Sequence, residues 1–203
     1  EYIRPARLVE RGEVVTKPAL SEIELIDLPT VDSLEAFNSD GLRTLCDTLD
    51  VQTMRERTLR NPGHAHQMQL FKDGGFFQTT PIQVGDQMVK PIDVTARILI
   101  DGWKYEPGEA DLTVMRVEAI GILGDSQVTL RWDLLDYYDS EADQSSMART
   151  TGFPAAAMGR MIADGTIQMA GVYPPETFGT QESIVLRLLA ELEQRNIHFQ
   201  KSM

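Results

Sequence analysis

Two arginines and a histidine stand close together in Arg57-Thr58-Leu59-Arg60-Asn61-Pro62-Gly63-His64. The first half of this stretch alternates like a strand. Asn61-Pro62-Gly63 is typical of a helix start, because Asn accepts from a free backbone N–H and Pro suits the first helical position. Helix N-termini favour anions through their unpaired N–H groups and dipole. We therefore predict that Arg57, Arg60 and His64 bind a carboxylate-bearing ligand where a strand meets a helix.

An ordinary structural role could explain the same residues, because arginines on a strand often form a solvated face. A metal site at His64 and His66 is disfavoured, since residues two apart on a helix point in different directions. No nearby Cys or His completes the three or four protein ligands that zinc takes. A metal hydrolase that uses both histidines stays open as a third function.

A second candidate site lies in Met147-Ala148-Arg149-Thr150-Thr151-Gly152-Phe153-Pro154. An arginine and two adjacent threonines at a helix start can hold a carboxylate or a phosphate oxygen. The alternative is that the threonines cap the helix and that Arg149 pairs with a surface acid. The residues by themselves favour this structural alternative.

Length and composition allow one large domain or two small ones. The chain has 203 residues, of which 42% are hydrophobic, so it can bury a core and lacks the composition of a disordered protein. Its formal net charge of -12 argues against a nucleic-acid partner, which would require a basic surface. An arginine cluster in such a chain is a positive patch in a negative field.

Cys46 is the single cysteine, so no intramolecular disulfide can form and a reducing compartment, the cytoplasm, is predicted. It lies in an apolar-periodic stretch, where a buried structural thiol is favoured over a nucleophile. No apolar run is long enough to span a bilayer, so no membrane partner is expected. The chain starts at Glu1 rather than Met, and we expect it to be a processed product or a part of a longer polypeptide.

Hydrophobic periodicity predicts one interleaved domain of the α+β class, with a mixed or antiparallel sheet flanked by helices. One hairpin is expected over 6–17 with its turn at Arg11-Gly12, and the longest over 111–138 across Gly124-Asp125-Ser126. Other strands are expected over 22–28, which Pro29 would end, and over 34–37, 51–60 and 197–199. Helices are expected from Ser39 or Asp40 to 48, and over 62–72, 91–102 and 147–164, with a last helix that Thr180 caps. Residues 76–89 read as a loop with a turn.

The sequence lacks the common motifs for nucleotide binding and for a hydrolase serine nucleophile. It has no P-loop, no G-x-S-x-G and no G-x-G-x-x-G that follows a strand and opens a helix. Gly121-Ile122-Leu123-Gly124-Asp125 lies inside the predicted long hairpin and is read as part of its turn. The chain therefore has no visible dinucleotide-binding half of its own.

Several strings resemble the C-terminal domain of the saccharopine dehydrogenase and lysine 6-dehydrogenase family. The 57–64 stretch is similar to the family motif Thr-Leu-Arg-Tyr-Pro-Gly-His, although Asn61 replaces its aromatic residue, so a stacking or phenol contact to the substrate would be lost. The resemblance continues in order along most of the chain. It is carried by Leu34-Glu35-Ala36-Phe37, Gly41-Leu42-Arg43-Thr44-Leu45, Ser146-Met147-Ala148-Arg149-Thr150-Thr151-Gly152-Phe153-Pro154 and the segment from Asp164-Gly165-Thr166-Ile167 to Pro175-Glu176.

The resemblance implies that residues 1–203 form the second domain of a two-domain dehydrogenase. The family's N-terminal Rossmann domain, which binds NAD or NADP, would lie outside this sequence, so no cofactor is expected in this part alone and the part alone would be inactive. The second domain would supply the substrate-side wall of the cleft and the contacts of a homodimer. The helix over 147–164 would pack near the nucleotide domain.

The implied reaction is hydride transfer between nicotinamide and the ε C–N bond of a lysine-like small molecule. By this resemblance Arg57 and Arg60 would hold carboxylates, and His64 would orient the substrate or carry a proton. Arg149 and Thr150 would make lesser contacts. The main alternative is a non-catalytic binding or assembly module on the same fold.

Overall fold

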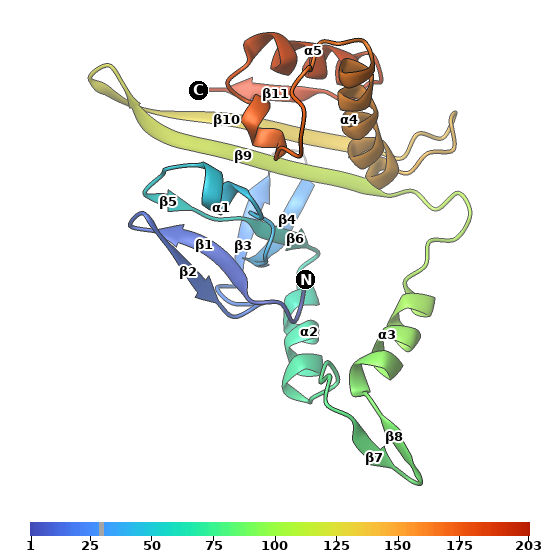
Figure 1. Ribbon diagram of the computed structural model, residues 1–203. Helices are drawn as coiled ribbons and strands as arrows, with labels where there is room; N and C mark the ends of the chain where they lie inside the picture. The colour runs from blue at the N-terminus through green and yellow to red at the C-terminus, as the bar shows by residue number, and fades with distance from the viewer. Residues whose placement is uncertain (29–30) are drawn as a thin grey trace. The chain divides into compact units, whose positions relative to one another are not determined.

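The computed structural model describes residues 1–28 and 31–203, which form two compact units, Glu1–Lys104 and Tyr105–Met203 (Figure 1). The α+β class is confirmed, since the described ranges contain five α-helices and eleven strands. Every ladder in these ranges is antiparallel and joins strands of one unit. The prediction of a single domain over 1–203 stays a prediction, and the two units are described one by one below.

The first unit contains a sheet of strand order β2-β1-β5, built from β1 (Ala6–Glu10), β2 (Glu13–Lys17) and β5 (Thr53–Met54). The predicted turn Arg11-Gly12 joins β1 to β2, and both of its residues have positive φ, as a tight hairpin turn requires. The short helix α1 (Leu45–Thr48) contacts β1. The core of this part consists of Ala6, Leu8, Val9, Leu42 and Cys46.

Helix α1 begins later than the sequence predicts, because both predicted caps are engaged elsewhere. Asp40 accepts a hydrogen bond of 3.0 Å from Arg7, and the Ser39 hydroxyl donates to Glu56 over 2.7 Å. The buried thiol predicted for Cys46 is confirmed.

A second sheet in this unit has the order β3-β4-β6, with β3 (Glu24–Leu28), β4 (Val31–Asn38) and β6 (Arg57–Arg60). Helix α2 (His64–Asp73) contributes to its core through apolar residues of its first two turns. This core is made of Leu20, Phe37, Ala65 and Met68.

The predicted strand over 51–60 is two strands that serve different sheets. Its first part is β5, which pairs with β1, and its last part is β6, which pairs with β4. Arg55 and Glu56 lie between them outside any strand. Pro29, which was expected to end the strand over 22–28, lies outside the described residues.

The predicted loop over 76–89 contains a small hairpin of β7 (Ile82–Val84) and β8 (Gln87–Val89). Gly85, with a φ of 59°, supplies the left-handed backbone of its turn. Helix α3 (Pro91–Gly102) follows and has the bounds that the sequence predicts, with Pro at its first position.

The second unit is built on a sheet of order β11-β10-β9, with β9 (Leu112–Leu123), β10 (Ser126–Tyr137) and β11 (Phe199–Ser202). The predicted long hairpin is confirmed, and its twelve residue pairs run without a bulge. Gly124, with a φ of 65°, lies in the two-residue turn. The final strand begins at the end of the predicted range 197–199.

The two faces of this hairpin differ, as its alternating charges predict. Arg116 lies directly opposite Asp133, and Arg131 lies directly opposite Glu118. Both pairs form ion pairs with a closest N–O distance of 2.6 Å. Leu134 lies on the other face, where it is buried against α5 and the segment before β11.

Helices α4 (Ser146–Ala163) and α5 (Glu182–Glu193) pack together in this unit, with the short 3-10 helix η1 (Pro175–Phe178) between them in the chain. Ser145 caps α4 by accepting from the Ala148 N–H over 3.1 Å. Gln181, rather than the predicted Thr180, precedes α5. The core residues are Leu134, Ala157, Met161, Ile167, Phe178, Ile184, Leu192 and Ile197.

Substitution of the buried Met161 tests the packing of this core. Met161→Ala should lower the free energy of unfolding of the second unit by about 2–5 kcal/mol, because a fully buried side chain leaves a cavity. Met147→Ala, on an exposed part of the same helix, should change it by less than about 0.5 kcal/mol. Chemical denaturation followed by circular dichroism measures both. Equal losses would contradict the described burial.

Candidate functional site

The junction of β6 and α2 contains the first predicted site. Side chains alternate along a strand, so Arg57 and Arg60, three residues apart, lie on opposite faces of β6. Arg57 forms an ion pair with Glu24 and donates to the carbonyl of Glu22 over 2.7 Å. Arg60 donates to the carboxylate of Glu1 over 2.8 Å. The strand therefore does not bring the two arginines to one ligand group.

The helix start differs from the sequence prediction. Helix α2 begins at His64, and its N-cap is Gly63, which has a left-handed φ of 94°. The prediction that Asn61 caps the helix is wrong, because the exposed Asn61 contributes only its carbonyl, which accepts from the His64 N–H over 3.2 Å. A glycine at the cap permits the sharp bend between β6 and α2.

The anion at this helix start is a carboxylate of the chain itself. Glu35 of β4, only 5% exposed, accepts from the Ala65 N–H over 2.8 Å and contacts His66 Nδ1 at 3.1 Å. Burial would raise the pKa of Glu35, but the N–H groups of Ala65 and Gly63 and the His66 side chain outweigh it and hold the pKa below its ordinary value. At this helix start the N–H groups of Gly63 and Ala65 are thus used by Glu35, and that of His64 is used by the Asn61 carbonyl.

His64 is the centre of a small cluster that the structure does assemble. Its Nε2 lies 2.9 Å from the Tyr2 hydroxyl, and its ring centroid lies 5.6 Å from that of Tyr2 and 6.1 Å from that of Trp103. Burial lowers the pKa of His64, and the positive charge of Arg60 lowers it further. The imidazole is therefore neutral at neutral pH and can accept a proton. Arg60, 40% exposed at its side chain, supplies the adjacent positive charge.

Tyr2 and Glu35 were missed by the sequence analysis. Tyr2 lies more than sixty positions before His64 in the chain, and no local pattern links the two. Glu35 carried a signal, because it shares the strand face of the apolar Phe37, where an acid requires a partner.

Arg149 and Thr150 belong to the second unit, where both are engaged by the fold. The side chain of Arg149, 6% exposed, forms ion pairs with Asp136 at 3.2 Å and Asp139 at 2.7 Å, and donates to the carbonyl of Arg195 over 2.9 Å. Thr150 donates to the carbonyl of Ser146 over 2.8 Å. The geometry thus favours the structural alternative for these residues, with the buried Asp136 and the partly exposed Asp139 as the partners of Arg149.

Helix α4 also begins on a carboxylate of its own chain. Asp111 accepts from the Ser146 N–H over 2.6 Å and from the Met147 N–H over 2.9 Å. Both helix starts singled out in the sequence therefore hold an internal anion.

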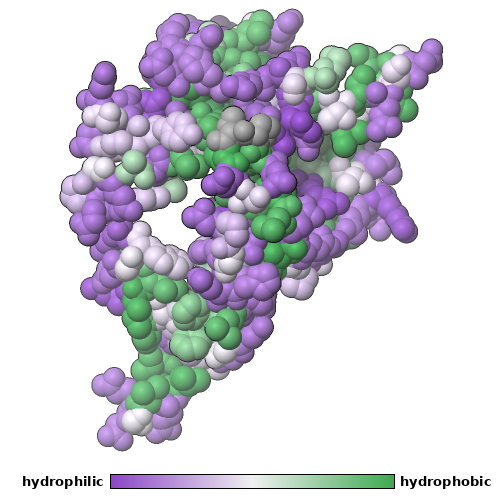
Figure 2. Space-filling model, turned by 180° about the vertical axis from the view of Figure 1, so that it is seen from behind, coloured by the Kyte–Doolittle hydropathy of each residue, from purple (hydrophilic) through white to green (hydrophobic). Residues whose placement is uncertain are grey.

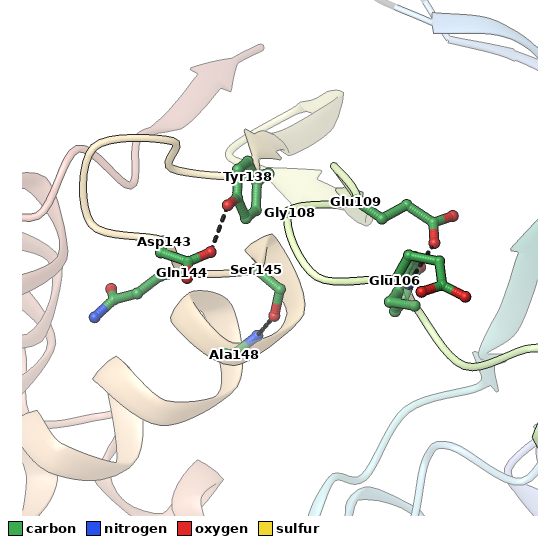
Figure 3. Close-up of a pocket in the computed structure, with 9 residues that line it drawn as sticks. Glu106, Gly108, Glu109, Tyr138, Asp143, Gln144, Ser145 and Ala148 are labelled. Carbon is green, nitrogen blue, oxygen red and sulfur yellow. Dashed lines mark hydrogen bonds between the residues drawn. The ribbon is translucent and has the colours of Figure 1, made fainter.

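Two pockets lie in the second unit. Figure 3 shows the first, of about 360 Å³, in which Tyr138 donates to Asp143 over 2.5 Å and Glu106 lies beside Glu109. Its lining is Tyr105, Glu106, Gly108, Glu109, Tyr138, Asp143, Gln144, Ser145 and Ala148. The second, of about 240 Å³, is mainly apolar and includes Thr150 of the predicted residues. It is lined by Thr113, Met115, Leu134, Thr150, Pro154, Leu192, Ile197 and Phe199.

Metal ligands do not gather in the part of the chain that the structure describes. Within residues 1–28 and 31–203, no three His, Cys, Asp or Glu side chains form a group that could hold an ion. His64 and His66 have separate partners, Tyr2 and Glu35. None of the helices in these ranges combines the length and apolar character that crossing a membrane requires.

Comparison with known proteins identifies related sequences. The family model described as saccharopine dehydrogenase C-terminal domain matches residues 1–197, which confirms the resemblance found in the sequence. Alpha-aminoadipic semialdehyde synthase, mitochondrial, from Bos taurus is 34% identical over 116 residues, and the same enzyme from Mus musculus is 33% identical over 116 residues. Each match covers 53% of this chain and 12% of the relative.

Substitution of Glu35 tests the internal anion. Glu35→Gln should lower the free energy of unfolding by about 1–3 kcal/mol, because a charge-assisted acceptor of the α2 N-terminus is lost. Since the pKa of Glu35 is lower in the folded than in the unfolded chain, its stabilisation is present above the unfolded pKa and is lost as the pH falls through the folded pKa. Denaturant titrations from about pH 7 to about pH 3 should show this loss in the parent and not in Glu35→Gln. Glu13→Gln, exposed on β2, is the control, and an equal effect there would argue against the assignment.

The environment of His64 predicts its titration. The imidazole should titrate below its ordinary pKa of 6.5, because burial and the charge of Arg60 both disfavour the protonated form. Arg60→Ala should raise the midpoint, whereas Arg97→Ala, on an exposed part of α3, should leave it unchanged. NMR of the ring protons measures both. No response to Arg60→Ala would show that its charge does not act on His64.

Proposed function

The chain belongs to the saccharopine dehydrogenase C-terminal domain family, and on that basis we propose that it is the substrate-binding and dimerisation domain of an amino-acid oxidoreductase. The proposed enzyme acts on the ε C–N bond of a lysine-like substrate, in the manner of a saccharopine dehydrogenase or a lysine 6-dehydrogenase. The names of both relatives, which contain an aminoadipic semialdehyde, support a substrate of this class. The chain spans about an eighth of their length, so this assignment stays a proposal.

The observation that carries the proposal is the cluster of Arg60, His64 and Tyr2. Arg60 already holds a carboxylate, that of Glu1, and both side chains are partly open to solvent. A substrate carboxylate can replace Glu1 with the same charge-assisted geometry. Arg60 is therefore proposed as the main residue that binds the substrate carboxylate. Arg57 stays bonded to Glu24 and to the Glu22 carbonyl and supports the strand.

The proposed role of His64 follows from its neutral state. A neutral imidazole beside the Tyr2 hydroxyl is proposed to take the proton that leaves the substrate nitrogen. Arg60, which lowers the pKa of His64, then favours return of that proton to the product or to solvent. Arg149 and Thr150 are proposed to position α4 rather than to touch substrate, because their polar groups are bonded within the second unit.

The proposed cofactor is NAD or NADP, which would supply the hydride acceptor or donor and would be held by an N-terminal Rossmann domain outside this sequence. The chain's own strand-to-helix junction does not fit a dinucleotide pyrophosphate, because Glu35 occupies the N–H groups that would cradle it. Arg60, His64 and Tyr2 are therefore proposed to contact the substrate and not the cofactor.

A non-catalytic binding or assembly module on the same fold is the rival function. Asn61, which replaces the aromatic residue of the family motif, favours it.

The cytoplasm is the proposed location, whereas the relatives carry mitochondrial names. Fractionation of cells that express the tagged gene product separates the two compartments.

Substitution of Arg60 tests the function. In the complete gene product, Arg60→Ala should raise KM for a lysine-like substrate at least about tenfold, because a charge-assisted bond to a carboxylate contributes about 1.5–3 kcal/mol. Arg97→Ala, on α3, is the matched control and should leave KM unchanged. Assays follow NAD(P)H absorbance with lysine and with saccharopine.

The outcomes separate the rival functions. An unchanged KM and kcat in Arg60→Ala would remove Arg60 from the site. Absence of NAD(P)-dependent turnover of lysine, saccharopine or related amines by the complete gene product would favour the binding module.

A further inference from the structure

The outer edge of β9 is long and pairs with no strand of the residues that the structure describes. β9 lies at one side of the sheet, and β10 pairs with all twelve of its residues. In the two-residue hairpin Leu123 and Ser126 form the first bonded pair, so the even-numbered residues of β9 direct their N–H and C=O groups away from β10. No backbone bond from this edge occurs among the described residues. Such an edge is a template for another strand.

β9 also lacks the features that keep natural edges unpaired. It contains no Pro and no bulge, and its two charged residues, Arg116 and Glu118, are each joined to β10 by an ion pair. Its apolar side chains remain open to solvent, Ile120 at 68% and Ile122 at 79% exposure. Figure 2 shows apolar side chains gathered along this hairpin, in the arm at the upper right.

We propose that β9 pairs antiparallel with β9 of a second copy of this chain, about a twofold axis that passes through Val117. This register places Arg116 directly opposite Glu118 of the partner subunit, and Glu118 opposite the partner's Arg116. The remaining pairs on that face are apolar, Val114 with the partner's Ile120 and Leu112 with the partner's Ile122. Backbone groups also match, because even-numbered residues meet even-numbered residues across the axis.

Charge selects this register over its neighbours. A one-residue move of the axis to residue 116 sets two arginines opposite each other, and a move to residue 118 sets two glutamates opposite each other, which is unfavourable across strands. With the axis at Val117, a row of alternating charge crosses four strands: Asp133, Arg116, the partner's Glu118 and the partner's Arg131. The six strands then form one continuous sheet with closed symmetry.

This inference rests on the proposed dimerisation role of the chain and specifies that β9 forms the dimer interface. On the other face, Met115 lies opposite the partner's Ala119, and Thr113 lies opposite the partner's Gly121. Thr113 and Met115 line the apolar pocket of the second unit. The partner strand would therefore border that pocket, so each copy would complete the rim of the other.

Cysteine cross-linking tests the register. Val117→Cys in the complete gene product places two thiols at directly opposed positions, within the distance that a disulfide spans. Ala119→Cys, two residues away on the same face, would be separated from its copy by about 13 Å along the strands and should not bridge. Under mild oxidation, non-reducing electrophoresis should show a dimer at least ten times faster for Val117→Cys than for Ala119→Cys and the parent protein. Equal rates would overturn the register.

A second variant keeps the test independent of cysteine chemistry. Ile120→Lys places a cation on the proposed interface and should raise the dimer dissociation constant at least tenfold in sedimentation equilibrium. Leu25→Lys, equally exposed at 65% on β3, is the control and should have no effect. A monomeric parent, or equal effects of the two variants, would overturn the interface.

NAD(P)-dependent turnover is measured on the same samples. Turnover without β9 pairing would refute the interface and leave the proposed function standing. A cross-linked Val117→Cys dimer without turnover would support the interface and refute the function.

Discussion

A carboxylate bonded to the start of a helix is the interaction on which both units depend. In the first unit Glu35 reaches from the central strand β4 to the N–H groups of α2. In the second, Asp111 beside β9 does the same for α4. Each bond fixes a helix to a sheet at one defined point, because the positive end of a helix has its unpaired donors only in the first turn. The position of His64 and of Arg149 follows from these two attachments.

The internal anions also decide what the backbone can bind. A helix start that already holds a carboxylate repels a second anion, so recognition of a ligand passes to side chains. In the first unit the available side chains are Arg60 and His64, with Tyr2 beside them. In the second unit Arg149 is enclosed by acids, and Ser146 donates to Asp136 over 2.7 Å within the same network.

The sequence predicted elements whose signals are local. Alternation and a Gly turn placed the 111–138 hairpin, Pro91 placed the start of α3, and the string of family motifs led to a family that the comparison confirmed. Alternation predicts a single strand where β5 and β6 lie, because a strand that changes from one sheet to another keeps its alternating side chains. The acceptor for α2 was missed for a different reason. Glu35 lies thirty residues before its partner Ala65, and local patterns do not report such pairs.

In the first unit Glu35 attaches helix α2 to the sheet, while other side chains are available to bind a ligand. This division has an evolutionary consequence, which Asn61 illustrates. The residue at this position is exposed and contributes only a backbone carbonyl to the turn before α2. Its side chain can therefore be exchanged, aromatic for amide, while Glu35 keeps the helix in place from a neighbouring strand. A scaffold arranged in this way can drift in specificity without first losing its fold. Homologous chains that share the architecture are thus free to diverge in the chemistry that they accept.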